Sequence, residues 1–384
     1  MHVRLGIDRL EEFSDLFKDK RIGLLTNHTG INSRFESTID LLHHNFQLVK
    51  LFAPEHGVRG NLQAGVGMQG YTDERTGLPV ISLYGEARKP TAEQLTDIDM
   101  LVFDIQDVGS RFYTYLYTMA YIMQACAAAG KSVVVFDRPN PIGATAVEGN
   151  LLEDSCRSFI GLYPIPQRYG LTIGECAQLF NAEYSINCDL TVVEMQNYHR
   201  NMFYDETGLP WVLPSPNIPM ADTCFTYNAT CIFEGTNISE GRGTTRPFDF
   251  VGAPWLDGFR LADVLNQLAL PGVFFRPHYF TPLPYLSSGS KYAGELCGGV
   301  EVHVLDRLTF CPVQTGVMML YTIRKMYSNR FAFTPPYRKG GLHMIDYNTG
   351  GAYIREGLGT EEVMARYTND SAIFTKLKHK YELY

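Results

Sequence analysis

The sequence lacks long hydrophobic runs. Every apolar stretch is interrupted by a charged residue, Gly or Pro well before the ~18 residues that a membrane-spanning helix needs. It also lacks a basic run, since 33 Lys and Arg residues stand against 41 Asp and Glu residues and the formal net charge is -8. A mildly acidic chain of this kind is not expected to have nucleic acid or a membrane as its main partner.

The signatures of several catalytic classes are absent as well. None of the eight cysteines forms a CxxC pair, so we expect reduced, buried thiols. The adjacent pairs HH at 43–44 and EH at 55–56 do not have the helical spacing of zinc ligands, and no metal is expected. There is no Walker A loop and no G-x-S-x-G elbow, and the GVG at 65–67 lacks the third glycine of a dinucleotide loop. We therefore expect no cofactor, and by elimination carboxylates and tyrosines carry any reaction.

The N-terminal residues MHVRLG do not have the basic-then-apolar layout of a signal peptide. Taken as given, the sequence predicts a cytoplasmic protein. If the sequence is a mature form whose signal has been removed, the protein is periplasmic or secreted.

The first half of the chain alternates buried-strand runs with amphipathic stretches. Hydrophobic residues make up 45% of the chain, enough for a packed core. Near-continuous apolar runs separated by helices predict a parallel sheet covered on both faces, in which ligands bind beyond the carboxyl ends of the strands. Strands are expected at 21–25, 48–52, 80–84, 100–105 and 132–136, and helices at 37–44 and 113–129.

A proline-rich stretch at 210–219 (LPWVLPSPNIP) indicates a domain joint or a rigid wall of a cleft. Beyond it we expect helices at 261–268 and 314–327, a strand at 299–305, and a last helix that begins at Thr360. The predicted fold class is α/β: a Rossmann-like, mainly parallel sheet domain over 1–228 and a smaller C-terminal α/β domain over 229–384. The active-site cleft is expected between them.

Polar clusters follow the apolar runs, where a parallel sheet places its ligand. Glu55 lies in one of them (APEHG), where partial desolvation would raise its pKa and suit it to general acid catalysis. The alternative is a glutamate that fixes its own loop through backbone amides.

A second cluster, DIQDVGSRFYTY, places Asp107 and Arg111 on either side of a glycine, with Tyr113 directly after them. One interpretation is an ion pair that braces the loop. The other is a carboxylate beside an arginine that grips a substrate anion, and two tyrosines in the same turn favour it slightly.

Two amides sit beside prolines that restrict the backbone: Asn140 in DRPNP and Asn217 in PSPNIP. The alternative is a rigid turn and nothing more, but a restricted backbone is costly for a merely structural amide, and such amides suit sugar hydroxyls or an acetamido group. Tyr84, Tyr113, Tyr169 and Trp255 are the aromatic residues expected to stack on a sugar.

The glycine-rich segment 233–247 carries Glu234, Asn237, Glu240, Arg242 and Arg246. Its arginines would suit a carboxylate-bearing ligand. Equally, they could pair with the two glutamates and hold the domains together.

Six motifs in order resemble one family closely: LLTNHTG, FAPEHGVRG, DIQDVGSRFYTY, DRPNPIG, PSPNIP and FEGTNISEGRGTTRPF. The sequence resembles the bacterial exo-β-N-acetylmuramidases of the NamZ type from about Gly6 to the C-terminus. The resemblance implies a glycoside hydrolase that releases N-acetylmuramic acid from the non-reducing ends of peptidoglycan fragments, in cell-wall recycling if the protein is cytoplasmic. It also implies Glu55 as a catalytic acid.

N-acetylmuramic acid carries a lactyl carboxylate, so cationic recognition is expected. Asp107 is the candidate for the second carboxylate that glycoside hydrolysis generally needs, with tyrosine or substrate acetamide assistance left open. Alternatives are a non-catalytic binding protein for muropeptides or acidic sugars, and a hydrolase of another acidic glycoside or ester. The predicted catalytic residues are Glu55, Asp107 and Tyr113; the predicted substrate-binding residues are Asn27, His56, Arg111, Arg138, Asn140, Asn217, Glu234, Asn237, Glu240 and Arg242.

Overall fold

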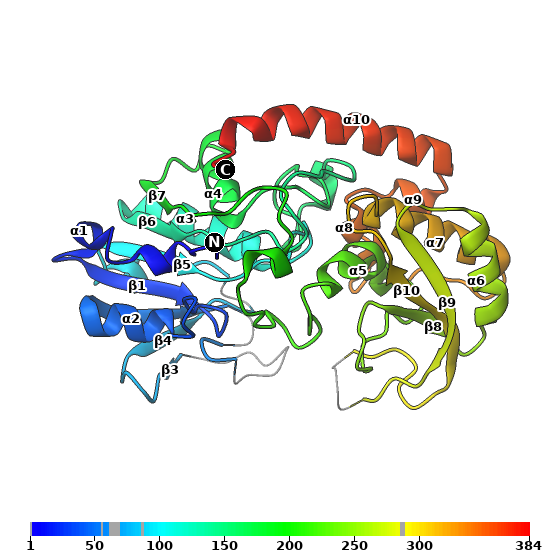
Figure 1. The fold of residues 1–384 in the computed structure, drawn as a ribbon, viewed down its shortest axis with the longest axis horizontal. Coiled ribbons are helices and arrows are strands. Elements are labelled where there is room, and N and C mark those ends of the chain that lie inside the picture. The colour runs from blue at the N-terminus through cyan, green and yellow to red at the C-terminus, as the bar shows by residue number, and fades with distance from the viewer. Residues whose placement is uncertain (1, 55–56, 61–69, 86–87, 285–288) are drawn as a thin grey trace.

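A computed structural model describes residues 2–54, 57–60, 70–85, 88–284 and 289–384. Two sheets organise this part of the chain (Figure 1). Two hydrophobic clusters pack against the larger sheet, and a third packs against the smaller sheet. Among the described residues, no helix is both long enough and apolar enough to cross a membrane.

The larger sheet confirms the predicted Rossmann-like, mainly parallel architecture. Its seven strands lie in the order β3-β4-β2-β1-β5-β6-β7, and all neighbours are parallel except β3 and β4. The interior strand β5, next to the central strand β1, is buried along its whole length, as its continuous apolar run predicts. The strands are β1 (Arg21–Thr26), β2 (Gln47–Ala53), β3 (Tyr71–Thr72), β4 (Pro79–Ser82), β5 (Met100–Asp104), β6 (Ser132–Phe136) and β7 (Leu190–Val193).

The helices of this domain begin and end at local signals. Helix α3 ends where Gly130 adopts φ 65°, a left-handed conformation that glycine adopts without strain. Helix α4 begins with a capping box between Thr172 and Glu175. The helices are α1 (Ser14–Phe17), α2 (Thr38–Asn45), α3 (Tyr115–Ala129) and α4 (Ile173–Glu183).

The smaller domain contains a three-stranded antiparallel sheet in the order β8-β10-β9, packed against α6 and α7. The strand expected at 299–305 is its central strand β10. Its strands are β8 (Phe250–Ala253), β9 (Val273–Phe280) and β10 (Cys297–Val304). The helices after residue 222 are α5 (Thr223–Thr230), α6 (Gly258–Gln267), α7 (Pro312–Met326), α8 (Met344–Thr349), α9 (Tyr353–Glu356) and α10 (Thr360–Lys378). The expected domain boundary at 228/229 falls inside α5.

The C-terminal segment returns to the first domain. Helix α10 runs from the smaller domain back over the larger one (Figure 1). The Tyr384 hydroxyl donates to the buried carboxylate of Asp137 at 2.7 Å and accepts from the Met195 amide at 2.8 Å. The Leu383 amide donates to Glu175 at 2.8 Å. The last two residues therefore link the two domains through partly buried hydrogen bonds.

Replacing Tyr384 by Phe is expected to lower the free energy of unfolding by about 1–2 kcal/mol, because it orphans the buried Met195 amide and removes one partner of Asp137. Urea denaturation of both proteins measures this difference. Tyr337→Phe is the matched control, since Tyr337 is 88% exposed. Equal losses in the two variants would contradict the proposed link.

Candidate active site

The loops that leave β1 and β5 meet at the carboxyl edge of the parallel sheet. From β1 the chain passes to β2 and β4, then returns to β5 on the other side of β1, so the strand order reverses between β1 and β5. Such a switch point is where open α/β sheets bind ligands. The Gln106 amide donates to Thr29 Oγ1 at 2.9 Å, which joins the two loops. The predicted residues Glu55 and His56, which follow β2 and Pro54 in the sequence, lie outside the described residues.

Several polar atoms of these two loops are buried without a hydrogen-bond partner among the described residues, and Asn27 Nδ2, Gln106 Oε1 and Asp107 Oδ1 are among them. The other end of the Asn27 amide is occupied, because Oδ1 accepts from the Thr29 amide at 2.9 Å and its hydroxyl at 2.6 Å. Unpaired buried polar atoms are uncommon and are found where water, an ion or a ligand completes a site. The crevice between the β1 and β5 loops is therefore polar, and some of its buried polar atoms have room for a further hydrogen-bond partner.

A cavity of about 170 Å³ lies between the two domains. Four predicted site residues line it, and they come from three separate sequence motifs: Tyr113, Asn217, Glu234 and Arg242. The lining residues are Phe112, Tyr113, Thr114, Tyr115, Ile160, Ser215, Asn217, Ile218, Tyr227, Glu234, Arg242 and Phe248. We call it the interdomain pocket.

One wall of the interdomain pocket is aromatic. Tyr227, on α5, makes edge-on contacts with Phe112, Tyr113 and Phe248 at centroid distances of 5.2, 5.9 and 4.7 Å. Such rings offer apolar faces with hydroxyl groups at their edge, which suits the mixed surface of a sugar. Sequence reasoning missed Tyr227 and Phe248 as pocket residues, although Phe248 is the last residue of the FEGTNISEGRGTTRPF motif.

The charged part of the pocket lining belongs to a chain of ion pairs on the second domain. Arg242 pairs with Glu234 and with Glu240, the latter at 3.3 Å, and Lys291 pairs with Glu240 at 2.8 Å. Burial opposes the charge of Arg242, but the two carboxylates outweigh it and raise the guanidinium pKa. The Arg242 guanidinium also lies 5.1 Å from the Phe248 ring centroid. A permanent cation is thus held at the pocket wall.

Tyr113 lies at the junction of this pocket and the strand-end loops. Burial, with smaller effects from Tyr115 and Asp107, raises the pKa of its hydroxyl well above the ordinary value. The phenol therefore stays protonated at neutral pH. It can donate a hydrogen bond to a substrate, but it is a poor nucleophile.

Asp107 is not among the residues that line the interdomain pocket. Its Oδ2 accepts from the Tyr169 hydroxyl and from the Gly109 amide, the latter at 2.8 Å. Burial raises the pKa of Asp107 to about 6, against the opposing effect of the Tyr169 hydrogen bond and the backbone amides. Tyr169, predicted to stack on a sugar, is instead buried as the hydrogen-bond donor to Asp107.

The raised pKa of Asp107 predicts a pH dependence of stability. The folded chain binds the proton more tightly than the unfolded chain, so this stabilisation is complete below about pH 4 and is lost as the pH rises through 6. Asp107→Asn removes the loss, so the variant should gain about 3 kcal/mol relative to wild type between pH 4 and pH 8. Urea denaturation at both pH values tests this. Asp154→Asn, at an exposed side chain, serves as the control, and parallel curves for Asp107→Asn and wild type would refute the effect.

Two arginines that were predicted to bind substrate contact groups of the protein instead. Arg111 is 0% exposed, and its guanidinium donates to the carbonyls of Asn150, Ile165 and Asn348 at 2.7, 3.0 and 3.3 Å. Arg138 is 3% exposed and forms a buried two-point ion pair with Asp104 at 2.5 and 2.9 Å. Both guanidiniums are committed to the protein, so the proposed substrate site does not include them.

Three further predicted substrate-binding residues and one stacking candidate also have partners within the protein. The Asn140 amide donates to the Leu171 carbonyl at 2.9 Å, and Asn237 bonds both the Arg330 carbonyl at 2.8 Å and the Ala332 amide at 2.9 Å. Glu240 is 1% exposed and supports Arg242 from behind the pocket wall. Trp255, a stacking candidate, donates to the Tyr292 hydroxyl at 3.3 Å and lies beside Tyr327 against the hydrophobic cluster of the smaller sheet.

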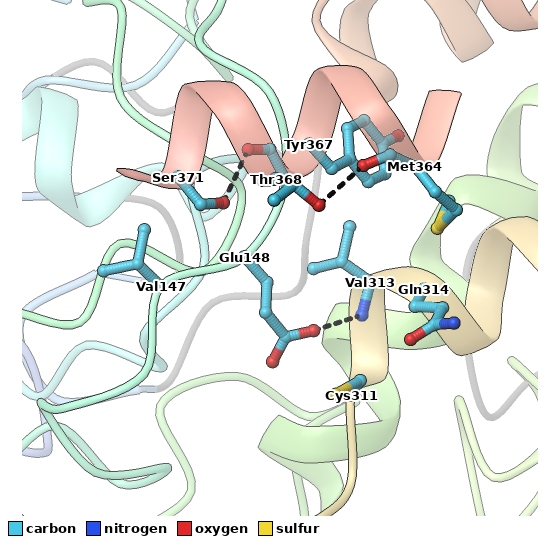
Figure 2. A pocket seen from close by; sticks show the side chains of 10 residues that line it. Val147, Glu148, Cys311, Val313, Gln314, Met364, Tyr367, Thr368 and Ser371 are labelled. Carbon is cyan, nitrogen blue, oxygen red and sulfur yellow. Dashed lines mark hydrogen bonds between the residues drawn. The ribbon is translucent and has the colours of Figure 1, made fainter. Parts of the chain in front are cut away.

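A second cavity, of about 380 Å³, lies under α10 and contains none of the predicted residues (Figure 2). Glu148 projects into it and accepts from the Val313 amide at the start of α7 at 3.1 Å (Figure 2). The same carboxylate pairs with Arg168 at 2.7 Å. Glu148 therefore joins the first domain to α7. Among the described residues, no group of three or more His, Cys, Asp or Glu side chains is placed to hold a metal ion.

Comparisons with known proteins cover the whole chain. The family description "Exo-beta-N-acetylmuramidase NamZ, N-terminal" matches residues 22–222, and its C-terminal counterpart matches residues 225–384. A peptidoglycan β-N-acetylmuramidase NamZ of Bacillus subtilis is 48% identical over 389 residues, which cover 100% of this chain and 91% of the relative. Two crystal structures of DUF1343 family proteins from Bacteroides fragilis superpose with TM-scores of 0.90 and 0.80, at 40% and 31% identity, and cover 100% of this chain and 99% of each of theirs.

Proposed function

Because the chain belongs to the NamZ family of exo-β-N-acetylmuramidases, we propose that it releases N-acetylmuramic acid from the non-reducing ends of peptidoglycan fragments. The observation that carries this proposal is the interdomain pocket. It gathers Tyr113, Asn217, Glu234 and Arg242 from three separate family motifs into one small cavity. A pocket of this size suits one terminal sugar better than an extended chain.

The pocket offers a partner for the group that distinguishes this sugar. N-acetylmuramic acid differs from N-acetylglucosamine by a lactyl ether with a carboxylate. Arg242 has five N–H donors, more than its contacts with Glu234 and Glu240 use, and its side chain is 24% exposed at the pocket wall. We assign it the lactyl carboxylate. Asn217, which also lines the pocket, suits the acetamido group.

Catalysis requires a proton for the oxygen of the departing sugar. Glu55 is the proposed general acid, since it follows the last residue of β2 by two positions and the carboxyl ends of β2, β1 and β5 share one edge of the sheet. Tyr113, held protonated, is proposed to donate a hydrogen bond to the sugar. Glycoside hydrolysis also uses a second carboxylate, for which Asp107 is the sequence-based candidate.

Product analysis with two isomeric disaccharides tests the proposal. The expected result is free N-acetylmuramic acid from N-acetylmuramyl-β-1,4-N-acetylglucosamine, and no cleavage of N-acetylglucosaminyl-β-1,4-N-acetylmuramic acid. Each disaccharide is incubated separately, because both isomers would yield the same two monosaccharides, and mass spectrometry shows whether the disaccharide has been cleaved. Cleavage of both disaccharides, or of the second alone, would overturn the assignment of the terminal sugar, and cleavage of neither would overturn the activity.

A further inference from the structure

We infer that Glu234, rather than Asp107, is the second catalytic carboxylate and acts at the anomeric carbon on the face opposite the leaving sugar. The inference rests on the proposed function. Among the described residues that line the interdomain pocket, Glu234 alone carries a carboxylate. A group that reacts with the sugar ring has to reach the cavity in which the ring lies.

The surroundings of Glu234 suit an ion that is held still but open to the pocket. Its side chain is 20% exposed and is paired with Arg242, which is itself backed by Glu240. Glu240 has only 2% of its side chain exposed and is further held by Lys291. Of the two carboxylates on Arg242, one is thus buried support and the other faces the pocket.

The environment of Asp107 differs in every respect. Asp107 is 5% exposed and one of its oxygens is occupied by Tyr169 and Gly109. Burial raises its pKa to about 6, which disfavours the ionised form that the second carboxylate must have. Two carboxylates whose environments differ in this way serve different tasks. We assign Asp107 to positioning the loop that carries Tyr113.

The reaction balances with Glu234 in this role. The bond between C1 and the leaving oxygen breaks, its electron pair goes to that oxygen, and the general acid supplies the proton. On the opposite face, a Glu234 oxygen either bonds to C1, giving an ester that water later hydrolyses, or accepts the proton of the water that bonds to C1. In both mechanisms, the covalent one and the one with an activated water, a negative carboxylate faces a sugar ring that develops positive charge.

Azide rescue of Glu234→Ala tests the inference. With p-nitrophenyl N-acetyl-β-muraminide, whose leaving group needs little protonation, the variant should lose at least about 10²-fold in kcat. Sodium azide, which fills the space of the carboxylate and attacks C1 itself, should restore nitrophenol release and yield the α-configured muramyl azide, identified by NMR. Glu234→Gln, which keeps the side-chain volume, should show the same loss if the alanine variant is unstable.

Two matched variants make the result specific. Glu240→Ala removes the other carboxylate partner of Arg242, and Asp107→Ala removes the competing candidate; neither should form an azide product. Activity of both Glu234 variants within tenfold of wild type would overturn the inference. So would a loss that azide does not rescue, or an azide product from Asp107→Ala. Failure of the proposed function is distinct, because wild-type protein would then release no nitrophenol.

Discussion

Glu55→Gln is expected to lower kcat for N-acetylmuraminide substrates by about 10²–10⁴-fold while the affinity for N-acetylmuramic acid changes little. The amide keeps the size and the hydrogen-bonding capacity of the side chain but cannot deliver a proton to the leaving oxygen. Kinetics with a natural disaccharide and calorimetric binding of N-acetylmuramic acid separate these two effects.

The reason for expecting so large an effect is positional. Glu55 follows the end of β2, which is paired in parallel with β1, and the loop of β1 is joined to that of β5 by the bond between Gln106 and Thr29. Glu356→Gln is the control, since the Glu356 side chain is 65% exposed and distant in sequence from every motif. Unchanged sugar release by Glu55→Gln would remove Glu55 from the mechanism.

Arg111→Ala is expected to cost about 3–5 kcal/mol of stability. The change opens a buried cavity and leaves the carbonyls of Asn150, Ile165 and Asn348 without their donor. Because Asn348 belongs to α8, the contact also joins the Tyr113 loop to the second domain. The neighbouring Gly350 has φ 72°, and an added Cβ there would lie 2.5 Å from Arg111 Nη2, so the backbone leaves room for the guanidinium.

Chemical denaturation of Arg111→Ala measures this loss. Arg34→Ala is the matched control, because the Arg34 side chain is 75% exposed and its ion pair with Glu36 is at the surface. An exposed pair of this kind contributes little. If Arg111→Ala were as stable as Arg34→Ala but no longer bound the sugar, the interpretation of Arg111 as a substrate ligand would return.

The parallel sheet was predictable because its strands carry their own signal. Continuous apolar runs placed β1, β2, β5 and β6 within one or two residues of their observed ends. The edge strand β7 is only half buried over most of its length, and the sequence gives no comparable run there. The return of Tyr384 to Asp137 could not be predicted, because a contact between residues 247 positions apart leaves no local pattern.

The sequence predicted many of the residues of the candidate site, but not how the fold arranges them. The motifs supplied Tyr113, Asn217, Glu234 and Arg242, which the fold brings into one pocket. They also supplied Arg111 and Arg138, whose partners are a set of carbonyls and Asp104. An arginine in a loop has the same sequence appearance whether it binds a ligand or the protein, so only burial and hydrogen-bond partners separate the two.

The most direct test of the account compares two aryl glycosides, p-nitrophenyl N-acetyl-β-muraminide and p-nitrophenyl N-acetyl-β-glucosaminide, with wild-type protein and Arg242→Met. If Arg242 binds the lactyl carboxylate, the wild-type protein has a higher kcat/KM for the muraminide than for the glucosaminide. Arg242→Met should lower this preference by about 10–100-fold, because it removes a charge-assisted hydrogen bond. A wild-type preference for the glucosaminide, or a preference that Arg242→Met leaves intact, would contradict the account.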